Sequence, residues 1–149
     1  MTDTAQDLLA LWEGVINRLI FLEKRFVFRQ DGLSLHPSEL HVLMAVRSEP
    51  ESNATRLAER LGVTKGAVSQ VLKRLEGKGV IVKHVDSSQK NEVTVSFTPS
   101  GRKVLESFLA QRGATQQRFH AYLSSLSETE GRTLRRFLDQ FGSFLPSGE

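Results

Sequence analysis

The sequence from residue 54 to residue 73 reads Ala-Thr-Arg-Leu-Ala-Glu-Arg-Leu-Gly-Val-Thr-Lys-Gly-Ala-Val-Ser-Gln-Val-Leu-Lys. Apolar residues recur in it at helical spacing, at Leu57, Leu61, Val63, Val68 and Val71. Small residues, Ala58 and Gly62, fall where two helices would cross closely, so the stretch predicts a helix-turn-helix. With its apolar positions buried, the second helix presents outward Lys65, Gly66, Ser69, Gln70 and Lys73. A helix face of amines and amides can enter a DNA major groove, so we predict DNA binding.

The length and composition of the chain limit its possible domain organisation, its cysteine chemistry and its association with membranes. Its 149 residues suit one compact domain, or a small domain with an attached assembly region. Cysteine is absent, which excludes disulfides, Cys-ligated zinc and a thiol redox switch within the chain. No apolar run reaches the roughly 18 residues typical of a membrane span, and the first residues are acidic, unlike a signal peptide. We therefore expect a cytoplasmic protein that does not contact membranes.

Positive charge is concentrated in and after this motif. Residues 54–103 hold ten Lys and Arg against four Asp and Glu, a net charge of +6, whereas the rest carries −3 of the total of +3. A surface that faces DNA phosphates needs such an excess of cations. A generic solvated basic face is the alternative, but the charge coincides with the motif and so favours a phosphate-facing surface.

Two helices are predicted before the motif. Residues 7–28 carry apolar side chains at a helical period over about six turns, which is longer than a small domain needs for its own core. Asp31-Gly32 ends this pattern. A second helix begins at His36-Pro37 with Glu39 in its first turn, where a carboxylate favours the helix dipole. Pro50 stops this helix.

Two β-rich runs follow the motif. Residues 80–85 and 92–97 flank a polar tip, and the second run alternates between apolar and polar residues, which predicts a hairpin. A hairpin directly after a recognition helix is a wing, and wings commonly place a basic tip at the minor groove. Thr98-Pro99 opens a long helix at about 99–124, and a capping box at residues 127–130 starts the last one. The predicted fold is mainly α with a small β wing, in the order α-α-α-α-β-β-α-α.

Three segments carry a resemblance to a known family. They are Leu-His-Pro-Ser-Glu-Leu-His-Val-Leu at 35–43, the motif from 57 to 70 with its continuation Leu-Glu-Gly-Lys-Gly-Val-Ile at 75–81, and the wing from 86 to Phe-Thr-Pro-Ser-Gly at 97–101. Together they resemble the MarR (multiple antibiotic resistance regulator) family of winged-helix transcription factors over nearly the whole chain. The resemblance implies a winged helix-turn-helix DNA-binding domain at 35–98, with dimerisation helices at 1–30 and 99–149.

The resemblance also implies a homodimer, and the residues support it independently. Three amphipathic segments flank a winged helix that is too small to cover them all, although a monomer could fold them back on itself. A two-fold dimer places two recognition helices about 34 Å apart, one turn of B-DNA, and so requires a pseudo-palindromic operator. We expect a sequence-specific transcriptional regulator that represses from such a site.

The DNA-binding residues divide into two predicted roles. Ser69 and Gln70 are the expected readers of base edges, with Lys65 and the backbone of Gly66 close by, because Gln pairs with adenine and Lys reaches guanine. Phosphate contacts that fix the register on DNA are expected from Thr64, Lys73, Arg74 and Lys90. The alternative for each residue is ordinary surface polarity.

The wing departs from the family pattern at its tip. The family usually places Arg two and five residues after the wing Asp, whereas this chain has Ser88 and Asn91 there. Lys90 is left as the cation of the tip. We expect weaker readout by the wing, with base recognition resting more heavily on the helix.

Many family members release DNA when a small aromatic or phenolic anion binds between the dimer helices and the winged domain. The candidate lining for such an effector is Trp12, Ile16, His41, Met44 and Phe108. A ligand there would act by favouring a dimer with its recognition helices at the wrong separation. Trp12, Met44 and Phe108 could instead fill a hydrophobic core, which is the commoner role of such residues at helical spacing.

Three other functions fit the sequence less well than DNA binding. A metal-responsive regulator is one alternative, but the four histidines include no His-x-x-x-His pair and no cofactor is expected. An enzyme is disfavoured, because there is no Gly-x-Ser-x-Gly elbow, phosphate-cradling loop or Cys nucleophile. A winged helix that binds protein instead of DNA would show apolar residues where this chain has Lys65, Ser69, Gln70 and Lys73.

Overall fold

The computed structural model describes residues 4–86 and 92–145, and it is mainly helical. Within these residues no helix is both long and apolar enough to cross a membrane. The elements in chain order are α1 (Thr4–Arg25), β1 (Phe28–Gln30), β2 (Leu33–Leu35), α2 (Pro37–Ser48), α3 (Ala54–Leu61), α4 (Lys65–Gly77), β3 (Ile81–Asp86), β4 (Glu92–Phe97), α5 (Pro99–Ser125) and α6 (Glu128–Phe144).

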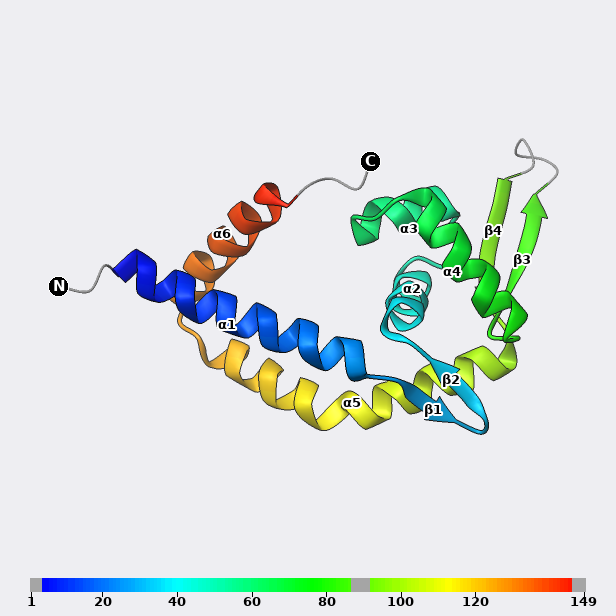
Figure 1. The fold of residues 1–149 in the computed structure, drawn as a ribbon, viewed down its shortest axis with the longest axis horizontal. Helices are drawn as coiled ribbons and strands as arrows, with labels where there is room; N and C mark the ends of the chain where they lie inside the picture. The colour runs from blue at the N-terminus through cyan, green and yellow to red at the C-terminus, as the bar shows by residue number, and fades with distance from the viewer. Residues whose placement is uncertain (1–3, 87–91, 146–149) are drawn as a thin grey trace.

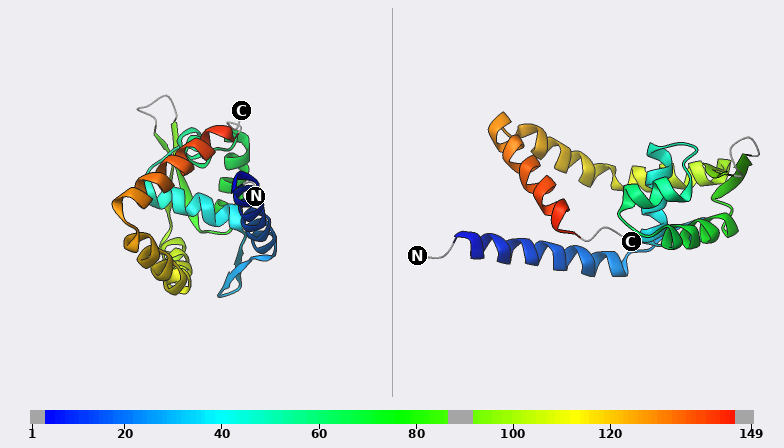
Figure 2. Two further views of the ribbon diagram at one scale, coloured as in Figure 1. Left: turned by 90° about the vertical axis from the view of Figure 1, so that its left-hand side faces the viewer. Right: turned by 90° about the horizontal axis from the view of Figure 1, so that it is seen from above.

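The elements separate into a compact end and an extended end (Figure 1). Helices α2, α3 and α4 and the β3–β4 hairpin lie together at the compact end. Helix α5 starts there and runs to the far end of the molecule, where α6 turns back toward α1 (Figure 2). The mainly α fold with a small β wing is confirmed.

Side-chain caps fix where four of the helices begin. Asn53 and Thr64 accept hydrogen bonds from backbone N–H groups of the first turns of α3 and α4. Thr98 caps α5 in the same way. At α6, Ser127 and Glu130 form a reciprocal capping box. Hydrogen bonds from the Ser127 side chain and backbone lower the pKa of Glu130, so this box contributes stability above the usual carboxylate pKa and loses it as pH falls.

The helix-turn-helix packs across a continuous hydrophobic core. Leu57 of α3 and Val68 of α4 are buried, together with Leu40 and Leu43 of α2. Gly62 ends α3 with a φ of 65°, a left-handed conformation that glycine adopts without strain. Val63 was expected in this core but is 41% exposed, because the turn directs it outward before α4 begins.

The wing is tied back to the start of the helix-turn-helix. Strands β3 and β4 pair in antiparallel register from Ile81 opposite Phe97 to Asp86 opposite Glu92. The backbone N–H of Val95 donates to the carbonyl of Ser52 at 3.2 Å, and a bridge joins Asn53 to Thr94. These contacts fix the base of the wing against α3. The tip of the wing at 87–91 lies outside the described residues.

The N-terminal helix is shorter than predicted, and the element order gains a hairpin. Helix α1 ends at Arg25 rather than near residue 28, and strands β1 and β2 pair from Phe28 opposite Leu35 around Asp31-Gly32. The strand direction turns Phe28 inward, where its ring lies 5.4 Å from that of Phe108. The predicted order of eight elements is therefore wrong at this point, because burial of Phe28 overrides the helical period.

The junction before α5 is closely packed against the junction after α4. The hydroxyl of Thr98 donates to the carbonyl of Gly79 at 2.7 Å, and the Thr98 N–H donates to the carbonyl of Val80 at 3.1 Å. A Cβ placed on Gly101 would lie 1.9 Å from the Val80 carbonyl oxygen. This position therefore requires glycine, and it carries α5 directly into the core of the winged domain.

We expect Gly101→Ala to destabilise the protein by roughly 3 kcal/mol, because the new methyl group meets backbone rather than a movable side chain. Urea unfolding measures this. Gly77→Ala is the matched control, since nothing lies within 4 Å of its added Cβ and alanine favours a helix. Equal stability of the two variants would contradict the account of the junction.

Candidate nucleic-acid interface

Helix α4 presents a polar face to solvent because all of its large apolar residues are buried in the core. Val68, Val71, Leu72 and Leu75 are buried. The exposed residues of α4 and its cap include every member of the predicted DNA-binding set that the structure describes: Thr64, Lys65, Gly66, Ser69, Gln70, Lys73 and Arg74. Lys90, the remaining member of the set, lies outside the described residues. The structure thus brings seven of the eight predicted residues onto one helix and its cap.

An open groove of about 450 Å³ separates α4 from the wing. Lys65 and Ser69 line it from α4, Thr55 from α3, and Lys83 from β3. Thr55 and Lys83 were not among the predicted site residues. Their only signal in the sequence is polarity, and the packing of the wing beside α4 places them along the same groove as Lys65.

Lys83 is held in place by an ion pair. Its amine lies 3.0 Å from the carboxylate of Glu76 on α4, and both side chains are partly exposed. Such an exposed pair contributes at most about 1 kcal/mol to stability. Its effect is chiefly geometric, since it connects β3 to the C-terminal half of the recognition helix.

The far end of α4 is anchored by a buried charge. Glu39 of α2 is 1% exposed, and its carboxylate oxygens accept hydrogen bonds from the Lys78 amine at 2.8 and 2.9 Å. The same carboxylate accepts from the backbone N–H of His36 at 2.9 Å, and the Lys78 amine donates to the Ser34 carbonyl at 2.7 Å. We call Glu39, Lys78 and their two backbone partners the Glu39 network. It joins α2, β2 and the end of α4.

Glu39 has a larger structural role than the sequence pattern predicts. A carboxylate in the first turn of α2 was expected to favour the helix dipole, and it does accept from the N-terminal backbone there. Its partner Lys78 is far along the chain, so no local pattern marks the pair. Arg74 also approaches this carboxylate, with 3.9 Å between its Nε and an oxygen of Glu39. The Arg74 side chain is still half exposed on the α4 surface.

The five predicted effector residues have different surroundings. The Trp12 ring lies edge-on to that of Phe141 on α6, with 5.0 Å between centroids. Phe108 is buried against Phe28. Exposed His41 lies 3.4 Å from a carboxylate oxygen of Glu23, which links α2 to α1. Ile16 and Met44 are both half-buried. These contacts do not by themselves define one pocket.

A resident metal ion is not suggested by the side-chain arrangement. Across residues 4–86 and 92–145, no three His, Asp or Glu side chains come together as a ligand set. The four histidines include one in the wing, His84, whose Nε2 lies 2.7 Å from the Ser96 hydroxyl.

A short helix-turn-helix whose second helix is exposed beside a β hairpin defines a winged helix-turn-helix DNA-binding protein. The model of the MarR family matches residues 32–90. A Bacillus subtilis (strain 168) protein described as an uncharacterized HTH-type transcriptional regulator, YhjH, is 30% identical over 141 residues, which cover 93% of this chain and 81% of that protein. The chain belongs to the MarR family of transcriptional regulators, and it is not an enzyme.

Solved structures share this fold. The S. aureus MepR–DNA complex is 25% identical with a TM-score of 0.61, over 75% of this chain and 79% of that one. Bordetella bronchiseptica BpsR, whose structure concerns regulation of DNA binding by 6-hydroxynicotinic acid, is 17% identical with a TM-score of 0.64. That match covers 91% of this chain and 98% of BpsR.

We expect Lys78→Ala to destabilise the protein by about 2–4 kcal/mol, because it leaves the Glu39 carboxylate buried without its charge partner. Chemical denaturation measures the loss. Lys73→Ala removes an exposed amine from the same helix and serves as the control, with an expected change below about 0.5 kcal/mol. Partial recovery in Glu39→Gln/Lys78→Ala would confirm that the unpaired charge is responsible, whereas a wild-type stability of Lys78→Ala would refute the network.

Proposed function

We propose that this regulator is a homodimeric repressor that binds a pseudo-palindromic operator and is released by a small aromatic or phenolic anion. The proposal assigns residues 35–98 to DNA binding, and residues 1–30 and 99–149 to dimerisation. The first turns of α5 serve both parts, because Val104, Leu105 and Phe108 are buried in the winged domain.

The extended shape of the protomer is the observation that carries the homodimer. Its accessible surface is 11380 Å², whereas a compact monomer of 16.7 kDa exposes about 7600 Å². Large apolar side chains are exposed on all three terminal helices, among them Leu11 at 68%, Phe119 at 62% and Phe144 at 77%. Apolar surface on this scale is typical of the interfaces of obligate dimers. A second copy would cover it.

The wild-type protein tests this directly. Sedimentation at micromolar concentration should give a dimer, and selection of bound duplexes from a random pool should yield inverted repeats with half-sites about one helical turn apart. A monomer, or a bound pool without inverted repeats, would refute the proposal.

The recognition helix offers two separable kinds of contact. Ser69 and Gln70, with Lys65 and the Gly66 backbone, are placed to read bases, while Thr64, Lys73, Arg74 and Lys90 are assigned to phosphates. The exposure of the α4 residues supports this assignment, and so does the DNA complex of MepR, a protein of the same fold. Thr55 and Lys83 join the phosphate-facing set because they line the groove beside Lys65.

We expect Gln70→Ala to cost roughly 1–3 kcal/mol of operator binding and to relax specificity at one base step. Lys73→Ala should weaken all duplexes alike and reduce the salt slope of log K by about one unit, because one phosphate contact is lost. Fluorescence anisotropy on operator and scrambled duplexes at several salt concentrations separates the two effects. Identical losses for both variants on every duplex would contradict the division of roles.

The effector is assigned to the region of Trp12, Ile16, His41, Met44 and Phe108, between the terminal helices and the winged domain. His41 supplies a polar group there, and half-buried Ile16 and Met44 supply apolar surface. BpsR, which shares the fold, is regulated by a hydroxylated aromatic acid. An anion that binds there would shift the separation of the two recognition helices.

We expect a phenolate or aromatic carboxylate that occupies this site to stabilise the dimer by about 2.7 kcal/mol at one hundred times its Kd, and to lower operator affinity. A thermal-shift titration followed by anisotropy with the same compounds measures both effects. Cyclohexanecarboxylate is the control for charge without aromaticity. If no aromatic anion produces either a thermal shift or DNA release, the effector site is wrong.

A further inference from the structure

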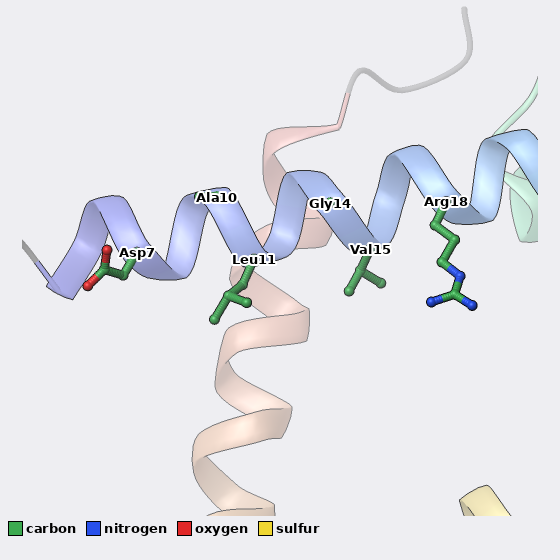
Figure 3. Close-up of a pocket in the computed structure, with 6 residues that line it drawn as sticks. All are labelled: Asp7, Ala10, Leu11, Gly14, Val15 and Arg18. Carbon is green, nitrogen blue, oxygen red and sulfur yellow. The ribbon is translucent and has the colours of Figure 1, made fainter.

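One face of α1 carries an open groove that the chain itself leaves uncovered. It has a volume of about 690 Å³ and is lined by Asp7, Ala10, Leu11, Gly14, Val15 and Arg18. Figure 3 shows the side chains of Asp7, Leu11, Val15 and Arg18 projecting from the same side of the helix. Because Ala10 has a small side chain and Gly14 has none, the helix backbone is accessible between them.

The contacts of α1 with its own chain lie on a different face. Trp12, which packs on Phe141, lies about 100° around the helix from Leu11. Glu23, which pairs with His41, lies on the same face as Trp12. Asp7, Leu11, Gly14 and Arg18 follow one another at intervals of four, three and four residues, so they form a single row. Within the described residues, neither Asp7 nor Arg18 has an ion pair.

This row is complementary to itself when a second copy lies antiparallel. A two-fold axis through the point between Trp12 and Glu13 places Asp7 opposite Arg18 of the other copy, and Leu11 opposite Gly14. Each pairing occurs twice, as an isologous interface requires. The Leu11 side chain meets the space that Gly14 leaves, and opposite charges meet at both ends, about 16 Å apart along the helix.

We propose that two copies of α1 pair antiparallel through this row, with two reciprocal Asp7–Arg18 ion pairs flanking two Leu11–Gly14 contacts. The pairing rests on the proposed homodimer and specifies its register. The occupant of the groove is therefore the same helix of a second copy. Other exposed apolar side chains of α1, such as Leu8 and Leu19, stay available on the flank for the partner's α5 and α6.

Charge exchange tests the register. Asp7→Arg and Arg18→Asp each replace two attractive pairs by two repulsive ones, so each should raise the dimer Kd by about tenfold. The double variant Asp7→Arg/Arg18→Asp restores opposite charges and should return to within about threefold of wild type. Glu13→Arg, the same change of charge on the opposite face of α1, is the matched control and should leave the Kd unchanged. Sedimentation velocity over a dilution series and subunit exchange measure these values.

Gly14→Leu provides a second test that does not depend on charge. Nothing lies within 4 Å of a Cβ added to Gly14 in the protomer, and leucine favours a helix, so the variant should fold with at least wild-type helicity. It should still weaken the dimer by tenfold or more, because Leu11 of the other copy loses its space.

The outcomes separate the register from the dimer itself. If wild type is dimeric while the charge variants and Gly14→Leu all associate like wild type, the register is wrong and the homodimer stands. If the single charge variants dimerise weakly and the double variant dimerises equally weakly, the Asp7–Arg18 pairing is also overturned. A monomeric wild type would overturn the homodimer and this inference together. Weakening by each single variant, with rescue by the double, establishes the pairing.

Discussion

The carboxylate of Glu39 is the charged group on which the placement of the recognition helix depends. A buried carboxylate costs several kcal/mol in lost hydration, so it is tolerated only when its partners are complete. Lys78 at the end of α4 and the backbone at the start of α2 supply them. Because Lys78 also binds the Ser34 carbonyl, one charge fixes α4 relative to both α2 and β2. The ion pair of buried Glu39 with Lys78 therefore helps to determine which face of α4 is exposed to solvent.

A second constraint connects this anchored domain to the terminal helices. Gly101 lets α5 begin in contact with the backbone after α4, so the first turns of α5 are packed into the winged domain. Any change in how the terminal helices associate is then carried directly to α4. This arrangement is compatible with the proposed effector site near α1, α2 and α5, from which a ligand would act on DNA binding without touching the recognition helix.

Much of the fold was accessible from local signals. Thr98 at the start of α5, Gly62 in the turn and the capping box at 127–130 each act within a few residues, so the sequence pattern alone located the starts of α5 and α6 and the turn of the helix-turn-helix. The β1–β2 hairpin was missed because its strands are three residues long and Phe26 and Phe28 continue the apolar period of α1. The turn residues Asp31 and Gly32 have positive φ angles, and the contact of Phe28 with Phe108, distant in sequence, favours the strand over a longer helix.

The class of protein, the helix-turn-helix and the side chains that α4 exposes could all be predicted from the amino-acid pattern, because helical periodicity and capping are local properties of the chain. The partners of Glu39, the groove that Lys83 and Thr55 share with Lys65, and the uncovered face of α1 became apparent from the three-dimensional packing. Those features depend on elements that meet across long stretches of chain. Burial and pairing energies depend on proximity in space, which sequence spacing does not encode.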